Sequence, residues 1–379
     1  MQNISYLDNS ATTKPCAESE ISLLKALRDD WGNPSSLHSL GINAEIIIED
    51  CKKSISKLLF CREDEIFFTS GGTEANNLAI LGAVESRRKR GNRIVTSSIE
   101  HPSVANTMKV LEDRGFEVLY LKPNSDGVIL PEDIYSAVND KTILVSIMLV
   151  NNETGAIQPV KYIADAVKKV NAPALIHSDA VQAFGKIPIN ISSLGVDLLT
   201  ASGHKIHAPK GIGFLYKKKG VTISPTVFGG GQQSGVRPGT EPLPIIAPLN
   251  GAIKALPNIE NELKNIKELN LYTRSVLEKI SKIQFNSSED SIPYIINISL
   301  PGFKSETMLH FLDSLGVIVS SGSACSKGKL SGVLSEMGLA TNRVDSALRI
   351  SFSRFNTKED ANRLADGLNL AINKLKRVK

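Results

Sequence analysis

The sequence predicts an α/β fold in which a large domain, built on a doubly wound and mainly parallel sheet, is followed by a smaller α+β domain. Three observations predict this fold. Short apolar runs alternate with amphipathic segments from about residue 60 to 220. A stretch rich in Gly and Pro follows at 227–244, and the pattern changes beyond it. With 379 residues, 41% of them hydrophobic, the chain is long enough for two domains.

Seven apolar runs predict the strands of the large sheet: EIFFTS, RIVTSS, FEVLYL, TILVSIMLV, PALIHSD, DLLTAS and GIGFLY. Helical patterns separate most of them, as in EANNLAILGAVESRRKRG and PSVANTMKVLEDRG. This alternation favours parallel strands joined by helices. Ligands of such sheets bind at the carboxyl ends of the strands, so the strand ends are where functional residues are expected.

The stretch VFGGGQQSGVRPGTEPLP at 227–244 has too many helix and strand breakers for a regular element, and it is too long for an ordinary connection. It therefore predicts a functional loop. Beyond it, a helical pattern from about 259 to 280 precedes three apolar runs, YIINISL, GVIVSS and ALRISFS. These predict a smaller α+β domain that begins near residue 256.

Composition narrows the class of protein. The formal net charge of +5 is spread along the chain, and the basic runs RRKR and KKK are short, which indicates solvated faces and not a nucleic-acid footprint. The N-terminus lacks the basic start and apolar stretch of a signal peptide, and no apolar run reaches the ~20 residues of a membrane helix. We therefore expect a cytoplasmic protein with no membrane and no direct nucleic-acid contact.

Four cysteines occur, at positions 16, 51, 61 and 325, and none forms a CxxC pair. Disulfides are not expected in the cytoplasm. Cys51 falls at helical spacing among apolar residues and is expected in the core. Cys325 lies in SSGSACSKGK, among small and polar residues that cannot bury it, with lysines two and four residues on. A reactive thiol and an incidental loop cysteine are both open at this point.

Polar residues follow several of the predicted strands. In FFTSGGTEANN, Gly72 and Thr73 open a helix, where free backbone N–H groups and a hydroxyl can hold a phosphate, although ordinary helix capping gives the same pattern. Asp179 ends the run ALIHSD with Gln182 three residues on, and Lys205 follows DLLTAS. Alone, Asp179 is equally an N-cap and Lys205 a surface charge. Together, a phosphate cup, an acid and a strand-end lysine are the parts of a pyridoxal phosphate site.

Nine motifs in order resemble the cysteine desulfurases of the aminotransferase-like pyridoxal phosphate superfamily: YLDNSATT, NPSSLHSLG, TSGGTEANN, EHPSV, NNETG, HSDAVQAFGKIP, GHKIHAPKGIGFLY, RPGT and SSGSAC. They span nearly the whole chain. The resemblance implies the fold-type I architecture of pyridoxal phosphate-dependent transferases. It also implies that residues 1–15 join 256–379 in the small domain, with 16–255 forming the large cofactor-binding domain.

The resemblance implies a cofactor site in the large domain. Lys205 would hold pyridoxal 5'-phosphate as a Schiff base, and Asp179 would pair with the ring nitrogen. His101 would stack on the ring. Asn152 and Gln182 would donate hydrogen bonds to the ring oxygen. The phosphate would be bound by the Gly72 backbone, Thr73, Ser202 and His204, and by Thr240 of a neighbouring subunit, which makes a homodimer part of the site.

The resemblance also implies a substrate and a reaction. Arg349 would bind the carboxylate of L-cysteine, together with Asn152. L-Cysteine would lose its α proton to Lys205, with His101 as the partner of its thiol, and would give its sulfur to Cys325 as a persulfide. Alanine would leave. Catalytic roles therefore fall to Cys325, Lys205 and His101, and no metal is expected.

The sulfur acceptor is open, because an iron–sulfur scaffold and a tRNA-thiolation enzyme both suit the pattern. The segment SKGKLSGVLSEMGL after Cys325 is a couple of residues shorter than the family leads us to expect. Two other functions compete with this one. A different pyridoxal phosphate enzyme would turn over other amino acids without Cys325, and a catalytically silent member would only bind sulfur-transfer partners.

Overall fold

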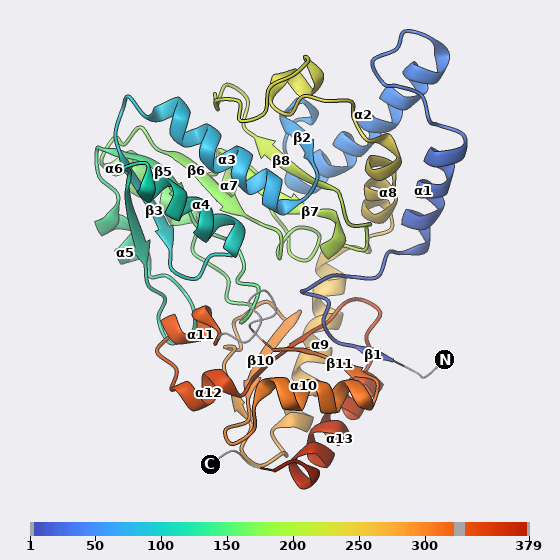
Figure 1. Ribbon diagram of the computed structural model, residues 1–379, viewed down its shortest axis with the longest axis vertical. Helices are drawn as coiled ribbons and strands as arrows, with labels where there is room; N and C mark the ends of the chain where they lie inside the picture. The colour runs from blue at the N-terminus through green and yellow to red at the C-terminus, as the bar shows by residue number, and fades with distance from the viewer. Residues whose placement is uncertain (1–3, 322–329, 377–379) are drawn as a thin grey trace.

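The computed structural model describes residues 4–321 and 330–376, and within them the chain forms two packed parts (Figure 1). The larger part is built on a seven-stranded sheet in the order β2-β8-β7-β6-β5-β3-β4. The smaller part holds a four-stranded sheet in the order β12-β13-β10-β9. This confirms the α/β fold with a large, mainly parallel sheet.

All seven predicted runs of the large sheet form strands. In spatial order they are β2 (Ile66–Thr69), β8 (Gly213–Lys217), β7 (Leu198–Ser202), β6 (Leu175–Asp179), β5 (Thr142–Ser146), β3 (Arg93–Ser97) and β4 (Glu117–Leu121). Strand β8 is antiparallel to both of its neighbours, and the other pairs are parallel. The run at 142–150 is shorter as a strand than predicted. Its last residues stay beside β6, where the Leu149 amide donates to the Asp179 carbonyl (2.8 Å), but they leave the regular ladder.

Successive strand residues enter two different cores, as expected for a sheet covered on both faces. Ile94 and Leu215 pack in a core with the apolar residues of helices α3 and α4, whereas Val95 and Phe214 face the core on the other side. The helices of the larger part are α1 (Ala17–Arg28), α2 (Ser39–Leu59), α3 (Gly72–Arg87), α4 (Pro102–Asp113), α5 (Pro131–Ala137), α6 (Lys161–Lys169), α7 (Ile191–Leu194) and α8 (Leu243–Lys254). Cys51 is fully buried on α2, as its spacing predicts.

The predicted functional loop at 227–244 contains one element that the sequence did not predict, a 3₁₀ turn η3 (Gln232–Gly235). The Gln233 side chain bonds to both the N–H and the carbonyl of Phe68 on the edge strand β2. Arg237 pairs with Glu74 in the first turn of α3 (2.9 Å). These contacts fix the loop to the sheet edge and to α3, which explains how so many Gly and Pro residues are held in place.

The smaller part combines short strands with helices. Its strands are β9 (Gln284–Phe285), β10 (Ile295–Ser299), β12 (Ser320–Ser321) and β13 (Ala347–Ser351), and its helices are α9 (Ile259–Leu277), α10 (Ser305–Ser314), α11 (Gly332–Glu336), α12 (Thr341–Asp345) and α13 (Lys358–Lys374). A two-stranded pair joins β1 (Ser5–Tyr6) to β11 (Val317–Ile318). The N-terminal segment thus packs on the small part, while the domain bounds at 15/16 and 255/256 stay a prediction.

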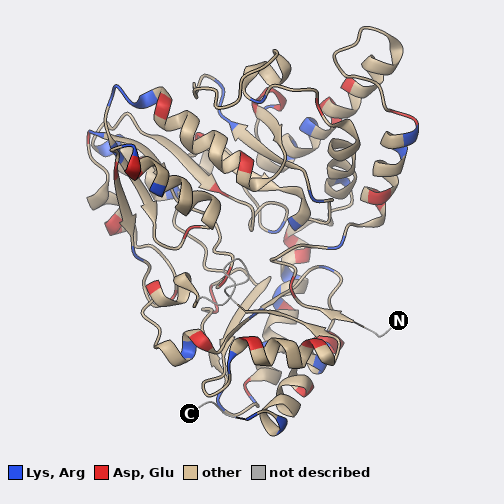
Figure 2. Cartoon of the chain, viewed as in Figure 1, with Lys and Arg blue, Asp and Glu red and all other residues tan. Residues whose placement is uncertain are grey.

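Charged residues of both signs are interspersed along both parts of the molecule (Figure 2). Among the described residues, no helix is both long and apolar enough to cross a membrane.

The larger part also contains two short 3₁₀ turns, η1 (Glu63–Glu65) and η2 (Gly203–Lys205). The second of these carries Lys205 directly after β7, at the carboxyl end of the central strands.

Candidate active site

One cavity of about 360 Å³ gathers most of the residues that the sequence singles out. The predicted residues that line it are Gly72, Thr73, His101, Asn152, Asp179, Gln182, Ser202, His204, Lys205 and Arg349. Thr240 is exposed and is not among the residues that line it. Cys325 lies outside the described residues, so its predicted role stays a prediction.

The topology of the sheet explains this convergence. Strands β6 and β7 are adjacent and parallel, and they end at Asp179 and Ser202. Strand β2 leads directly into α3, whose first residue is Gly72. The carboxyl ends of parallel strands meet at one edge of the sheet, where residues distant in sequence can surround one ligand.

Lys205 extends from turn η2 toward the N-terminal segment. Its Nζ donates to the carbonyl of Ala11 (2.8 Å) and to that of Ser10. Both acceptors belong to the segment that runs from the small part to α1. The amine is therefore held by backbone groups at the wall of the cavity, at the junction of the two parts.

Asp179 is 6% exposed, and its carboxylate accepts two hydrogen bonds. Asn76 Nδ2 donates to Oδ2 (2.7 Å), and the Val181 amide donates to Oδ1 (2.9 Å). A buried carboxylate needs such partners to offset the loss of water. These bonds fix the plane of the carboxylate beside the cavity, which suits a fixed partner for a ring nitrogen.

His101 is the N-cap of α4, and its Nδ1 accepts a hydrogen bond from the Ser103 amide (3.2 Å). The Ser103 hydroxyl lies 2.8 Å from the same nitrogen. Burial lowers the pKa of His101, Asp179 raises it, and Lys205 lowers it, with burial the largest effect. The ring is thus neutral at neutral pH.

The expected phosphate site lies where α3 begins. Helix α3 has 16 residues, and its free N–H groups and Thr73 hydroxyl lie at a helix N-terminus, which favours an anion. Ser202 and His204 line the same cavity. Burial, with Lys205, Lys210 and Lys186 nearby, lowers the pKa of His204 to about 4, so its ring is a neutral hydrogen-bonding group.

Arg349 reaches the cavity from β13 of the small part and is 3% exposed. Its Nη2 donates to Asp8 Oδ1 (2.7 Å) and its Nη1 to the Asn152 carbonyl (3.0 Å). Its Nε is buried and has no hydrogen-bond partner within the described part of the chain. The guanidinium thus keeps a donor for a further acceptor.

The donor set fits pyridoxal phosphate. Its phosphate matches the start of α3, its ring nitrogen matches Asp179, and its aldehyde matches the Lys205 amine. The Ser10 hydroxyl and Arg349 Nε are buried at the cavity and unpaired among residues 4–321 and 330–376. Unsatisfied buried polar atoms of this kind are rare in folded proteins and are expected to meet a ligand.

The sequence did not single out four polar residues that complete this site: Ser10, Asn76, Ser103 and Lys186. Asn76 lies one helical turn after Gly72 within TSGGTEANN, and that spacing is the signal that could have found it. Lys186 is buried, and its Nζ donates to Gln182 Oε1 (3.1 Å), while Gln182 Nε2 donates to the Ser10 carbonyl (2.9 Å).

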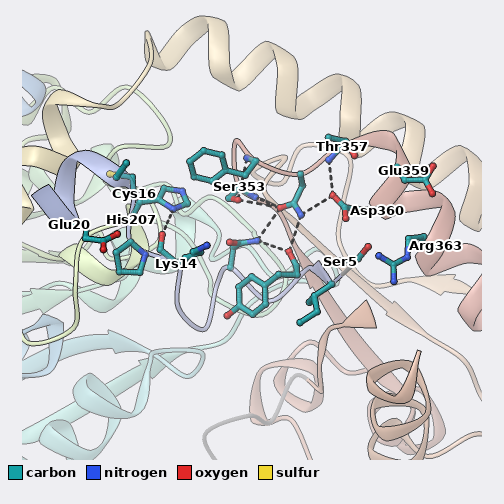
Figure 3. Close-up of a pocket in the computed structure, with 17 residues that line it drawn as sticks. Ser5, Lys14, Cys16, Glu20, His207, Ser353, Thr357, Glu359, Asp360 and Arg363 are labelled. Carbon is teal, nitrogen blue, oxygen red and sulfur yellow. Dashed lines mark hydrogen bonds between the residues drawn. The ribbon is translucent and has the colours of Figure 1, made fainter. Parts of the chain in front are cut away.

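A larger cavity of about 630 Å³ lies between the N-terminal segment, the start of α1 and the turn before α13 (Figure 3). None of the predicted residues lines it. Asn356 at its wall bonds to Asn9 (3.1 Å) and to the Tyr6 carbonyl (2.9 Å), and its Nδ2 also contacts Asp360 (3.3 Å). These hydrogen bonds connect the N-terminal segment to the small part at this cavity.

The described residues contain no cluster of His, Cys, Asp or Glu suited to a metal ion.

Comparison with known proteins gives a consistent result. Residues 5–364 match the family "Aminotransferase class-V". The cysteine desulfurase IscS of Dictyoglomus turgidum is 39% identical over 378 residues, covering 98% of this chain and 95% of that protein. A solved NifS-like protein superposes with a TM-score of 0.92 at 35% identity, covering 98% of this chain and all of the other.

A further solved structure, of SspA in complex with cysteine, has a TM-score of 0.82 at 31% identity and covers 93% of this chain and 99% of that one. Enzymes of this family depend in general on pyridoxal phosphate. The relatives match from end to end and in sequence as well as in fold. The chain belongs to the aminotransferase class-V family and, within it, to the cysteine desulfurases.

Proposed function

We propose that this chain binds pyridoxal 5'-phosphate at Lys205, converts L-cysteine to L-alanine, and collects the sulfur on Cys325 as a persulfide. The observation that carries the proposal is the meeting of Lys205, Asp179 and Arg349 around one cavity. The similar structure of SspA in complex with cysteine supports L-cysteine as the substrate.

Pyridoxal phosphate, when bound, supplies an aldehyde that condenses with amines and a ring that withdraws electrons from the substrate α carbon. The chain supplies the rest. Asp179, fixed by Asn76 and Val181, holds the charge of the ring nitrogen. The Lys205 amine, oriented by the Ser10 and Ala11 carbonyls, takes the α proton of L-cysteine and later returns a proton to the product.

Arg349 orients the substrate through its carboxylate. Its two terminal nitrogens already bind Asp8 and the Asn152 carbonyl, which fixes the plane of the guanidinium, and Nε remains for the incoming carboxylate. The charge-assisted bond favours amino acids with a free carboxylate. Since Arg349 comes from the small part and Lys205 from the large part, the substrate binds across their junction.

The described residues on either side of 322–329 support a role for Cys325. Ser320 on β12 pairs with Arg349 on β13, so the chain enters this segment beside the substrate-binding arginine. On the far side, Ser331 Oγ donates to Glu153 Oε2, next to Asn152 at the cavity. Cys325 follows Ser321 by four positions, and four residues of extended chain span up to ~14 Å.

The transfer of sulfur to Cys325 needs no oxidant or reductant. The Cys325 thiolate attacks the substrate sulfur, an S–S bond forms, and the C–S bond of the substrate breaks. The electron pair of that C–S bond stays with the β carbon, which takes a proton to give alanine. The persulfide sulfur then passes to an acceptor protein, for which an iron–sulfur scaffold and a tRNA-thiolation enzyme are the two proposed classes.

A homodimer is part of this proposal. Helix α1 packs on α8 and leaves Ile21, Leu24 and Leu27 exposed. Trp31, shortly after α1, is exposed as well, and so is Phe228 in the loop that holds Thr240. Exposed apolar side chains of this size are typical of a protein interface. A second copy of the chain would bury them and bring Thr240 to the phosphate of its partner. The proposed compartment is the cytoplasm.

The test is alanine formation from L-cysteine by the purified protein in the presence of a thiol reductant. Wild type is expected to form alanine, whereas Lys205→Ala and Cys325→Ser are expected to lose about 100-fold or more of this rate. Full activity of Lys205→Ala would refute the cofactor site. Equal activity of wild type and Cys325→Ser would mean that Cys325 does not carry the sulfur, and turnover of other amino acids would then indicate an aminotransferase.

A further inference from the structure

A chain of hydrogen bonds joins Asp179 to His101 behind the cavity. Asn76 Nδ2 contacts Asp179 Oδ2 (2.7 Å) and Ser103 Oγ (2.8 Å), and Ser103 Oγ contacts His101 Nδ1 (2.8 Å). Asn76 is 1% exposed and comes from α3, while Ser103 and His101 come from the start of α4. The residues expected at the ring nitrogen and at the ring face are thus connected through one buried amide.

The bonds given by the Asn76 side-chain amide and by the Ser103 backbone N–H have fixed directions, because these groups can only donate. The Thr200 hydroxyl donates to Asn76 Oδ1 (2.5 Å), so the amide oxygen faces β7 and the amide nitrogen faces Asp179 and Ser103. Both hydrogens of Nδ2 are then committed, one to each neighbour. An amide is suited to this position because it supplies two donors from one nitrogen, whereas a carboxylate supplies none.

The Ser103 hydroxyl accepts from Asn76, and its own hydrogen is left to donate to His101 Nδ1. The Ser103 amide donates to the same nitrogen (3.2 Å). Since the backbone N–H can only donate, Nδ1 carries the lone pair that accepts this bond. In a neutral imidazole the proton then lies on Nε2.

We propose that Asn76 is a positioning residue that, through Ser103, holds His101 in the tautomer with its proton on Nε2 while it fixes the carboxylate of Asp179. His101 then offers a hydrogen-bond donor to the reacting sulfur and does not act as the base for the α proton, which leaves that task to Lys205. The consequence for catalysis rests on the proposed function, but the tautomer itself does not.

The surroundings of His101 agree with a neutral ring. Burial opposes its protonation, Lys205 opposes it as well, and Asp179 alone among these groups favours it. The hydrogen bonds at Nδ1 therefore select the tautomer of this neutral ring.

The experiment is ¹⁵N NMR of the holoenzyme labelled at histidine, recorded without L-cysteine. The chain has six histidines, and His101→Gln identifies the signals of interest. Wild type is expected to show His101 with an unprotonated Nδ1 and a protonated Nε2 across the neutral pH range. This readout needs no turnover, so it stands or fails independently of the proposed reaction.

Variants test whether Asn76 and Ser103 set the tautomer of His101. Ser103→Ala and Asn76→Ala are expected to shift the tautomer ratio of His101 by roughly five- to tenfold toward Nδ1–H. Ser103→Ala removes the hydroxyl that contacts Nδ1, and Asn76→Ala removes the bond that directs this hydroxyl toward Nδ1. Ser103→Thr keeps a hydroxyl and is expected to restore the wild-type ratio. Asn106→Asp, at an exposed position of the same helix α4, is the matched control and should change nothing.

Asn76→Asp should have the largest effect, because it places a second carboxylate against Asp179. The visible absorption of the bound cofactor should shift, and kcat should fall about tenfold or more while KM changes less than about threefold. A proton on Nδ1 of His101 in wild type would overturn the proposal. So would a wild-type tautomer ratio in Ser103→Ala and Asn76→Ala together.

Discussion

At the scale of single residues, the least expected feature is a buried lysine that the reaction does not use. Lys186 donates to Gln182 (3.1 Å), and its Nζ lies 5.7 Å from the centre of the Tyr294 ring. Burial, with the nearby charges of Lys205 and Arg349, lowers the pKa of Lys186 to about 7. This lysine holds Gln182, which lines the cavity, at a cost in stability.

That cost depends on pH. In the unfolded chain the Lys186 amine keeps its proton up to about pH 10.5, whereas in the folded chain it loses the proton above about pH 7. Between these values the unfolded state binds more protons, so the free energy of unfolding rises with pH. We predict that Lys186→Met removes this rise, which amounts to roughly 3–4 kcal/mol between about pH 7 and about pH 10.

Chemical denaturation of wild type and Lys186→Met at several pH values measures this difference. Lys168→Met, at an exposed position of α6, serves as the control and should follow wild type. Parallel stability curves for wild type and Lys186→Met would show that Lys186 does not titrate in this window.

The sequence predicted most of the residues that line the cavity. Some were predicted because they follow strands, as Asp179 and Lys205 do, and others, such as His101 and Arg349, only through the resemblance to the family. Asn76, Ser103 and Lys186 escaped notice for a physical reason. Each has an ordinary explanation on a helix or in a turn, and only tertiary packing reveals that it is buried against Asp179, His101 or Gln182.

At the scale of elements, the strands of the large sheet and the helices between them could be predicted, because hydrophobic periodicity depends only on residues that are close in sequence. The order of the strands, and the antiparallel placement of β8 between β2 and β7, depend on contacts between distant segments and did not follow from that pattern. The 3₁₀ turn η3 escaped prediction as well, because Gln233 is held there by the edge strand β2 and not by its neighbours in sequence.

The start of α3 gives a test at this scale. A Cβ on Gly72 would lie 2.8 Å from Val181 Cγ2 and 3.7 Å from Ser202 Cβ. The first is shorter than packed atoms allow, so the start of the helix or Val181 must move. We predict that Gly72→Ala weakens the binding of pyridoxal phosphate by about tenfold or more, because the N–H groups leave their place at the phosphate.

Titration of the apoprotein with pyridoxal phosphate, followed by visible absorbance, measures this affinity. The double variant Gly72→Ala with Val181→Ala makes room for the new methyl group and should recover much of the loss. An unchanged affinity in Gly72→Ala would show that the phosphate does not lie at the start of α3.

At the scale of the whole molecule, the exposed apolar surface near α1 is the proposed interface between two chains. Leu27 is 55% exposed and Trp31, the one tryptophan of the sequence, is 65% exposed. Helix α1 and the loop before α8 both lie in the upper half of Figure 1, on the large part of the molecule. The loop that carries Thr240 is fixed to α3 by the ion pair between Arg237 and Glu74.

We predict that Leu27→Glu converts the proposed dimer to a monomer, because it places a charge in the proposed apolar interface. Sedimentation measures the mass, and the fluorescence of Trp31 should move to longer wavelength as water reaches the ring. Leu271→Glu, at a 51% exposed position of α9 in the small part, is the control and should remain dimeric. A monomeric wild type would rule out a site shared between subunits.

The central claim is that Cys325 takes sulfur from L-cysteine in the cavity around Lys205, and mass spectrometry of the protein after a single turnover tests it most directly. The other cysteines are poor competitors, since Cys16 and Cys51 are buried and burial raises the pKa of Cys61 to about 12. We predict one added sulfur atom on the peptide that holds Cys325, removed by reductant and absent from Lys205→Ala. Sulfur on another cysteine, or the same gain in Cys325→Ser, would contradict the account.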